Sequence, residues 1–344
     1  MTLTIIIIYY HQTELLKRCL LSIARSCLPE SYEILLVVNR ADPLLEQFIK
    51  STGLQIRTVQ GEKQRPGALR NQALRLASGK IIYFLDDDVI VERNTLVNLC
   101  EGFARHQDCN VIGGPNLTPD ASTLFQKCSG EVLASFFGSA GVSARYRLPR
   151  QESPADDRHL ILCNLAIRRD ALQKENFEFN ESVVSNEENL LLQQLARTGH
   201  RMLLMPSVAV YHERRKTWSG FAAQIFKYGT GRGQMTRLMP RTLSLTHLLP
   251  AFFLGYLLLV VLLHRPEFFI PLAVYTSLAL VVSLRIALKN RNALFFPSSM
   301  ILFPTCHIAY ATGFLKGILE KQRGRNTSGS SQKNSQVRPA EAKP

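Results

Sequence analysis

The chain has 344 residues, 46% of them hydrophobic, and carries a formal net charge of +14 at pH 7. This length allows one large domain or two smaller ones. The seven cysteines are scattered and form no CxxC pair. This argues against a disulfide framework or a zinc site and is typical of reduced thiols in a cytosolic domain.

The basic excess admits two kinds of partner, nucleic acid or an anionic membrane surface. Residues 243–319 are dominated by long apolar runs, and Lys and Arg crowd residues 212–241 just before them. Positive charge beside apolar runs is typical of the cytoplasmic flank of membrane helices. The sequence therefore favours a membrane partner and no nucleic acid.

The first 85 residues alternate between strand and helix patterns. Apolar runs predict strands, and amphipathic spacing predicts helices between them. The strands cover residues 3–10, 33–38, 54–59 and 81–85, and the helices cover residues 14–25, 43–51 and 66–77. This alternation predicts an α/β domain with a mainly parallel central sheet, in which ligands bind beyond the carboxyl ends of the strands.

The pattern is less regular beyond residue 100. Strands are expected over residues 111–115, 160–168 and 202–211, and a helix over residues 186–197. Residues 243–263 and 268–288 are long and apolar enough to span a bilayer. Residues 294–315 contain prolines and form either a third span or a re-entrant segment. We expect a first domain over 1–235, a membrane domain with two or three helices over 236–320, and a basic, disordered tail over 321–344.

Three consecutive carboxylates, Asp86, Asp87 and Asp88, follow the fourth strand in the stretch YFLDDDVIV. One aspartate suffices to cap a following helix, and three repel one another unless something positive compensates. Mg²⁺ and Mn²⁺ bind carboxylate oxygens and often share them with substrate phosphates. The triplet therefore indicates a divalent-metal site, with helix capping as the alternative.

Four segments occur in a recognisable order along the chain. They are TIIIIYYHQ, RPGALRNQALRLASG before IIYFLDDDV, NEENLLLQQL, and VAVYHE. Over about residues 2–235 this arrangement resembles the family 2 glycosyltransferases, which implies the GT-A fold and a nucleotide-sugar donor. The apolar tail, with its stretch CHIAYATGFLKG, is similar to that of the membrane-anchored exopolysaccharide members, including those of succinoglycan assembly.

The resemblance implies roles for the acids. Asp86 and Asp88 match the two acids of the DxD motif. The match implies that Asp86 positions the ribose or diphosphate, and that Asp88 and Asp86 are ligands of a divalent metal, Mg²⁺ or Mn²⁺. Asp87 takes the middle position, as a donor contact or a solvated acid. Such a metal stabilises charge on the leaving diphosphate. Glu188 stands where the catalytic aspartate of the family usually stands, and Glu187 stands where the neighbouring glutamate does, so the choice of base between them is open.

Other matches concern the donor. Arg70 matches the arginine before the DxD strand and implies a place near the nucleotide, and His212 matches a histidine that can reach the metal or diphosphate. Asn39 ends the second strand where the family commonly has an aspartate that contacts the base, and it can still hydrogen-bond a uracil edge. Arg232 either holds diphosphate or belongs to the basic membrane flank.

Together these features predict a metal-dependent, inverting glycosyltransferase. It would be a multi-pass protein of the inner (plasma) membrane with a cytoplasmic catalytic domain. We expect a UDP-sugar as the favoured donor and a polyprenyl-linked saccharide as the acceptor, in cell-envelope or exopolysaccharide synthesis. The alternatives are a polyprenyl-phosphate sugar synthase, which needs no strong base, and a non-catalytic membrane scaffold that keeps the fold.

Overall fold

The computed structural model describes residues 2–10, 12–38, 43–61, 65–174 and 176–320. Asn39, one of the predicted donor contacts, and the tail predicted over residues 321–344 therefore lie outside the described residues.

The first half of the central sheet follows the predicted alternation. Parallel strands pair in the order β3-β2-β1-β4, and helices connect them. The strands are β1 (Leu3–Tyr9), β2 (Tyr32–Val38), β3 (Ile56–Gln60) and β4 (Ile81–Asp86), and the helices are α1 (Thr13–Ala24), α2 (Pro43–Ser51) and α3 (Pro66–Leu76). Asp86 is thus the last residue of β4, at the carboxyl edge where ligands are expected.

The second half of the central sheet mixes strand directions. Beyond β4 the order continues β9-β6-β10-β8, in which β9 runs antiparallel to both of its neighbours. These strands are β6 (Cys109–Gly113), β8 (Ser153–Pro154), β9 (Asn164–Arg168) and β10 (Arg201–Leu204). A second, small sheet contains β5 (Val89–Val91), β11 (Val210–His212) and β7 (Asn116–Leu117) in the order β5-β11-β7. The prediction of a mainly parallel α/β sheet is confirmed.

Two predicted strands were too long. Residues 202–211 do not form one strand, because Pro206 opens a 3₁₀ turn that separates β10 from β11 and sends them into different sheets. Proline lacks the backbone N–H that a central strand needs. The strand expected over residues 160–168 begins only at Asn164, where a turn between Ile161 and Asn164 has ended.

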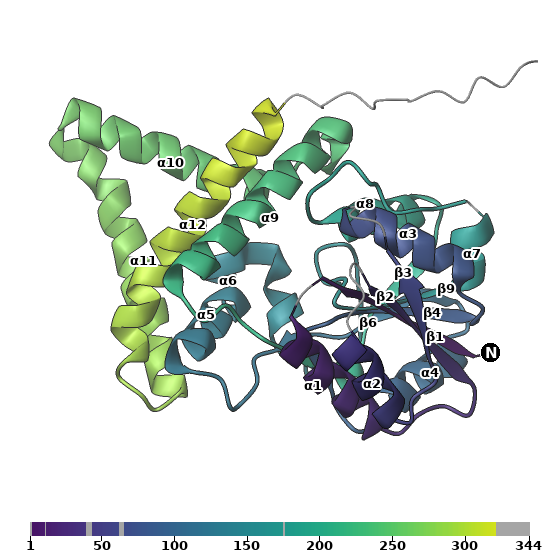
Figure 1. Cartoon of the computed structure of the whole chain (residues 1–344). Coiled ribbons are helices and arrows are strands. Elements are labelled where there is room, and N and C mark those ends of the chain that lie inside the picture. The colour runs from purple at the N-terminus through teal and green to yellow at the C-terminus, as the bar shows by residue number, and fades with distance from the viewer. Residues whose placement is uncertain (1, 11, 39–42, 62–64, 175, 321–344) are drawn as a thin grey trace, which may run out of the picture.

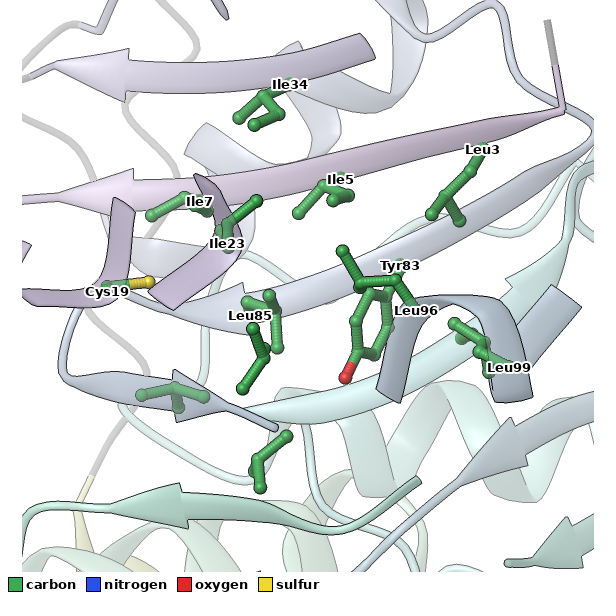
Figure 2. Close-up of a cluster of buried hydrophobic side chains, with 14 of the residues drawn as sticks. Leu3, Ile5, Ile7, Cys19, Ile23, Ile34, Tyr83, Leu85, Leu96 and Leu99 are labelled. Carbon is green, nitrogen blue, oxygen red and sulfur yellow. The ribbon is translucent and has the colours of Figure 1, made fainter. Parts of the chain in front are cut away.

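Both faces of the central sheet are buried. The alternation of side chains along β1 sends Leu3, Ile5 and Ile7 to one face and Ile6 and Ile8 to the other. Figure 2 shows the first set beside Tyr83 and Leu85 of β4. α1, α2 and α4 (Thr95–Arg105) cover this face, and α3, α7 (Arg169–Lys174) and α8 (Glu187–Arg197) cover the other. The core thus fixes the strand ends that carry the polar residues.

A helical region adjoins the sheet (Figure 1). α9 and α12 lie side by side there, and α10 and α11 extend away from the sheet. Its helices are α5 (Leu124–Ala134), α6 (Phe136–Ser139), α9 (Trp218–Leu238), α10 (Leu245–Leu263), α11 (Phe269–Lys289) and α12 (Phe295–Leu319), and its 3₁₀ segments are Ala140–Tyr146, Pro240–Thr242 and Pro266–Phe268. Among the described residues, the segments Leu245–Leu263 and Pro266–Lys289 are long and apolar enough to cross a membrane by length and composition.

Glycines let α9 and α12 approach until their backbones touch. A Cβ atom added to Gly229 or Gly233 of α9 would collide with a backbone carbonyl of α12, and one added to Gly313 or Gly317 of α12 would collide with a carbonyl of α9. Both pairs have the four-residue spacing that places small residues on one face of a helix. The crossing therefore depends on glycine at all four positions.

Candidate active site

The acid triplet sits in a turn at the end of β4. Asp86 ends the strand, and Asp87 and Asp88 lead into β5. Burial, with the neighbouring carboxylates of Asp88 and Asp86, raises the pKa of Asp87 to about 7. Burial also raises the pKa of Asp86, although the cation of Arg70 opposes it. The strand end therefore concentrates negative charge that the protein balances only in part.

Asp88 has a protein partner. His212, the last residue of β11, places its Nε2 3.1 Å from Asp88 Oδ1, and both side chains are about 10% exposed. Although burial alone would raise the pKa of Asp88, the imidazole of His212 holds it below its usual value. The short second sheet thus brings a histidine from more than a hundred residues away onto the triplet.

The donor atoms fit a divalent metal of the Mg²⁺ or Mn²⁺ type. Ligand atoms of Asp86, Cys163 and His212 lie within 4.8 Å of one another, and the buried Nδ1 of His212 has no hydrogen-bond partner among the described residues. Cys163 suits such a metal poorly, because burial raises its pKa well above the usual range and Asn116 donates a hydrogen bond to its sulfur at 3.3 Å. Asp86 and His212 remain of this cluster, and Asp88, whose Oδ1 lies 3.1 Å from His212 Nε2, adds a second carboxylate. The two carboxylates supply the oxygen ligands that hard cations prefer.

Arg70 links the acid triplet to the acid pair Glu187 and Glu188. From α3 its guanidinium reaches Asp86 Oδ1 at 3.2 Å and Glu187 Oε1 at 2.6 Å, and the residue is only 8% exposed. A buried, charge-assisted bond of this kind holds both partners in place. Its neighbour Asn71 instead exchanges hydrogen bonds with the backbone of Phe179, so it supports the loop before α8.

Glu187 and Glu188 begin α8, and their environments differ. Asn186 precedes them in a left-handed conformation with φ of 63°, and its amide donates to the carbonyl of Tyr228 on α9. Glu187 is held by Arg70, whereas the nearest cation to Glu188 is Arg145, at 3.8 Å. Burial raises the pKa of Glu188 to about 7, with Arg145 opposing the rise and Glu187 adding to it.

This difference bears on the choice that the sequence leaves open. A carboxylate that is fixed in a short ion pair is already occupied, whereas one with a pKa near neutrality is suited to take a proton at physiological pH. The geometry therefore favours Glu188 over Glu187 as the proton acceptor.

Arg145 is a site residue that the sequence analysis did not single out. It lies in the 3₁₀ segment Ala140–Tyr146 and is 5% exposed. It donates to the carbonyls of Arg158 and Asp157 and, at 2.7 Å, to Asn189 Oδ1. The irregular pattern around it carries no sequence signal of function, because its place depends on how the loop over residues 147–159 folds back.

One cavity of about 1060 Å³ brings the predicted residues together. Its lining includes every predicted site residue that the structure describes, namely Arg70, Asp86, Asp87, Asp88, Glu187, Glu188, His212 and Arg232. The lining also includes Arg145 and Arg215, and it extends to apolar residues of α6, α10, α11 and α12. The cavity is thus polar where it meets the sheet, whereas its helical side combines apolar residues such as Phe137, Leu249 and Phe253 with polar ones such as Lys227 and Arg232.

Comparisons with known proteins agree with this architecture. The model of a family described as Glycosyl transferase family 2 matches residues 4–175, half of the chain. The mannosyltransferase PcManGT from Pyrobaculum calidifontis, solved with GDP-Man and Mn²⁺, superposes with a TM-score of 0.59 at 16% identity over 92% of this chain and 87% of that one. TarS 1–349 from S. aureus, solved with UDP-GlcNAc, superposes with a TM-score of 0.53 at 16% identity over 92% and 91% of the two chains.

At such low identity these structures show a shared fold. Comparison with curated protein sequences finds no match. The family match covers β1 to β4, the acid triplet and Arg70, and it ends before the acid pair of α8 and the segment VAVYHE, on which the predicted resemblance also rests. The GT-A fold predicted from the sequence is confirmed, and the chain belongs to glycosyltransferase family 2.

Proposed function

We propose that this chain is a membrane-anchored, metal-dependent, inverting glycosyltransferase. It transfers a sugar from a nucleotide-sugar donor to a lipid-linked saccharide at the cytoplasmic membrane face, in cell-envelope or exopolysaccharide synthesis. One observation carries the proposal. A single cavity joins the acid triplet and His212, the weakly paired Glu188, and the apolar helices α10 and α11.

The donor would bind at the carboxyl edge of the sheet. Asp86, Asp88 and His212 would hold the divalent metal, which when bound supplies positive charge to the diphosphate that leaves. Arg70 positions Asp86 through its ion pair. The cation of Arg215, which lines the same cavity, favours the ionised form of Asp88. GDP-Man with Mn²⁺ in PcManGT and UDP-GlcNAc in TarS support a nucleotide sugar. A uracil contact from Asn39 stays a prediction.

Glu188 would act as the base. As the acceptor hydroxyl attacks the sugar carbon C1, its proton passes to the Glu188 carboxylate and the bond from C1 to the diphosphate oxygen breaks. The new bond forms on the opposite face, which inverts the configuration. Glu187, held by Arg70, would keep α8 in register with the donor site.

The helical region would anchor the protein by a two-helix hairpin. Leu262 of α10 and Ile270 of α11 are 74% and 65% exposed, and apolar surface of this extent is typical of a membrane face. α12 returns to α9, and Lys289 at the end of α11 pairs with Glu131 of α5 at 2.8 Å. These contacts favour two spans, α10 and α11. The hairpin that they form begins and ends beside the catalytic domain. The division of the chain near residue 235 stays part of this proposal, and it falls within α9.

The first test is donor turnover by membranes that contain the protein. A panel of UDP-, GDP- and dTDP-sugars is offered with Mn²⁺ or Mg²⁺ to the wild type, to Asp88→Ala, and to Asp108→Ala. Asp108 is a matched control, because it is an exposed aspartate paired with Arg201. We expect metal-dependent release of a nucleoside diphosphate that is lost only in Asp88→Ala.

The same assay separates the alternatives. A polyprenyl-phosphate sugar synthase would keep its activity in Glu188→Gln, because a phosphate acceptor needs no strong base. A non-catalytic scaffold would turn over no donor, with or without lipid extract, and would show no metal-dependent nucleotide binding.

A further inference from the structure

Arg232 occupies a different part of the cavity from the acid triplet. A path of contacts runs from Asp86 through Arg70 to the acid pair, and from Glu188 to Arg145 at 3.8 Å. Arg145 then donates to the Asp157 carbonyl, and Asp157 Oδ2 lies 4.0 Å from Arg232 Nη1. Among these contacts Arg232 reaches neither the acid triplet nor Arg70, and it is linked to the candidate base only through Asp157 and Arg145.

The charge of Arg232 is poorly compensated. The residue is 4% exposed, yet its contacts are the thioether of Met235 at 3.4 Å, the hydroxyl of Tyr310, and the carboxylate of Asp157 at 4.0 Å. A buried cation normally has a close counter-charge, because its desolvation is otherwise costly. Arg232 lines the cavity, so an anion inside the cavity can supply that charge.

Two further features make this part of the cavity suitable for an anion. His247, in the first turn of α10, and Arg158 also line the cavity. Arg232 and Arg158 both lie within electrostatic reach of His247. A helix N-terminus favours negative charge through its free N–H groups. The start of α10 therefore reinforces the field of Arg232.

The apolar end of the cavity begins immediately beyond this point. Leu249, Pro250 and Phe253 follow His247 on α10 and line the cavity. Phe253 stacks on Tyr275 of α11 with ring centroids 4.4 Å apart. An elongated ligand with its anion at the start of α10 would therefore run along this helix between apolar walls.

We propose that Arg232 binds the phosphate of a lipid-phosphate-linked acceptor, whose hydrocarbon chain lies along α10 against Phe253. This inference rests on the proposed function and names the acceptor subsite of the same cavity. It replaces the role of Arg232 as a donor contact that the sequence suggests. A lipid phosphate fits because it joins one compact anion to an apolar chain, whereas free phosphate leaves the apolar end unused.

Binding of farnesyl phosphate to the purified full-length chain in detergent tests the inference. Farnesol and inorganic pyrophosphate are the comparison ligands, and each is expected to bind at least about tenfold more weakly. Arg232→Gln should weaken farnesyl phosphate binding by about 10- to 100-fold, the usual range for a lost charge-assisted bond. The exposed Arg241 provides the matched control, Arg241→Gln, which should bind as the wild type does.

A second pair of variants tests the apolar end. Phe253→Ala should weaken farnesyl phosphate binding by about tenfold and leave pyrophosphate binding unchanged. Phe252→Ala is its control, because Phe252 is 61% exposed on the same helix. Arg232→Lys, which keeps the charge, should retain more affinity than Arg232→Gln, and thermal melting establishes that each variant is folded.

Three results would overturn the inference. The first is unchanged farnesyl phosphate affinity in folded Arg232→Gln. The second is equal loss of metal-dependent nucleotide binding in that variant, which would return Arg232 to the donor site. The third is pyrophosphate binding as tight as that of farnesyl phosphate. Because the readout is binding, failure of the proposed function would appear separately, as a wild-type protein that binds the lipid phosphate but turns over no donor.

Discussion

The carboxyl edge of the central sheet and the crossing of α9 with α12 constrain the cavity by opposite means. At the sheet edge, long polar side chains hold one another, as Arg70 holds Asp86 and Glu187 and as His212 holds Asp88. At the crossing, side chains are absent and backbone lies on backbone at four glycines. The comparison teaches that charge pairs set the chemistry of this site, whereas the glycines set its shape.

The largest effect is expected at the sheet edge, from Glu188→Gln. Loss of a general base typically lowers turnover by about 10²- to 10⁴-fold. Nucleotide binding should persist, because the metal-side residues are untouched. Glu178→Gln is the control, since Glu178 is 51% exposed in a surface pair with Arg75. Single-turnover transfer of labelled sugar measures the effect, and activity within about threefold of the wild type would remove Glu188 from the chemistry.

Arg70→Gln should give the next largest effect, on stability. It leaves Glu187 buried without its cation, and breaking such a pair costs about 3–5 kcal/mol of unfolding free energy. Arg75→Gln lies on the same helix but breaks only an exposed pair, so it should cost about 0–1 kcal/mol. Denaturant unfolding measures the unfolding free energy of both variants. Equal losses would mean that the buried pair contributes no more to stability than the exposed one.

The crossing is tested by Gly233→Ala. The added methyl group meets the Phe314 carbonyl, which cannot rotate away, so the helices must separate at a cost of about 1–3 kcal/mol. Gly255→Ala on α10 is the matched control, because nothing lies within 4 Å of its added methyl group. It should be neutral or slightly stabilising, since alanine favours helix over glycine. Thermal melting in detergent measures both, and an unperturbed Gly233→Ala would show that the crossing tolerates separation.

The pH dependence is the smallest expected effect. Because Glu188 must lose its proton to act as a base and its pKa is about 7, transfer should fall about tenfold per pH unit below 7. The folded state also retains this proton up to about pH 7, whereas an ordinary glutamate loses it near 4.5. The contribution of Glu188 to unfolding free energy therefore falls as pH rises between these values. Rate and unfolding profiles of the wild type and Glu188→Gln check both signs.

Much of the sheet edge could be predicted from the sequence, because local patterns determine it. The apolar runs of β1 and β4 fix the strands, and strand direction then places Asp86, Asp87 and Asp88 at the ligand edge. The family resemblance added Arg70 and Glu188, and one cavity contains both. What it could not decide was the division of labour between Glu187 and Glu188, which depends on which one Arg70 reaches.

The helical region was predicted less completely, because its arrangement depends on contacts between distant segments. The apolar runs identify α10 and α11, and the four-residue spacing of Gly229 and Gly233 is visible in the sequence. The spacing does not name the partner helix. Arg145 was missed for the same reason, since its site lies where two irregular segments meet.

The glycine crossing also has a consequence for how the protein is made. α9 leaves the ribosome well before α12, and at about 5–20 residues per second α10 and α11 occupy several seconds of synthesis between them. During that interval the catalytic domain can fold, but the cavity lacks the wall that α12 contributes. Docking of α12 onto α9 therefore completes the helical end of the cavity last, so a chain stopped after α11 would keep the polar residues of the sheet edge and have no closed pocket.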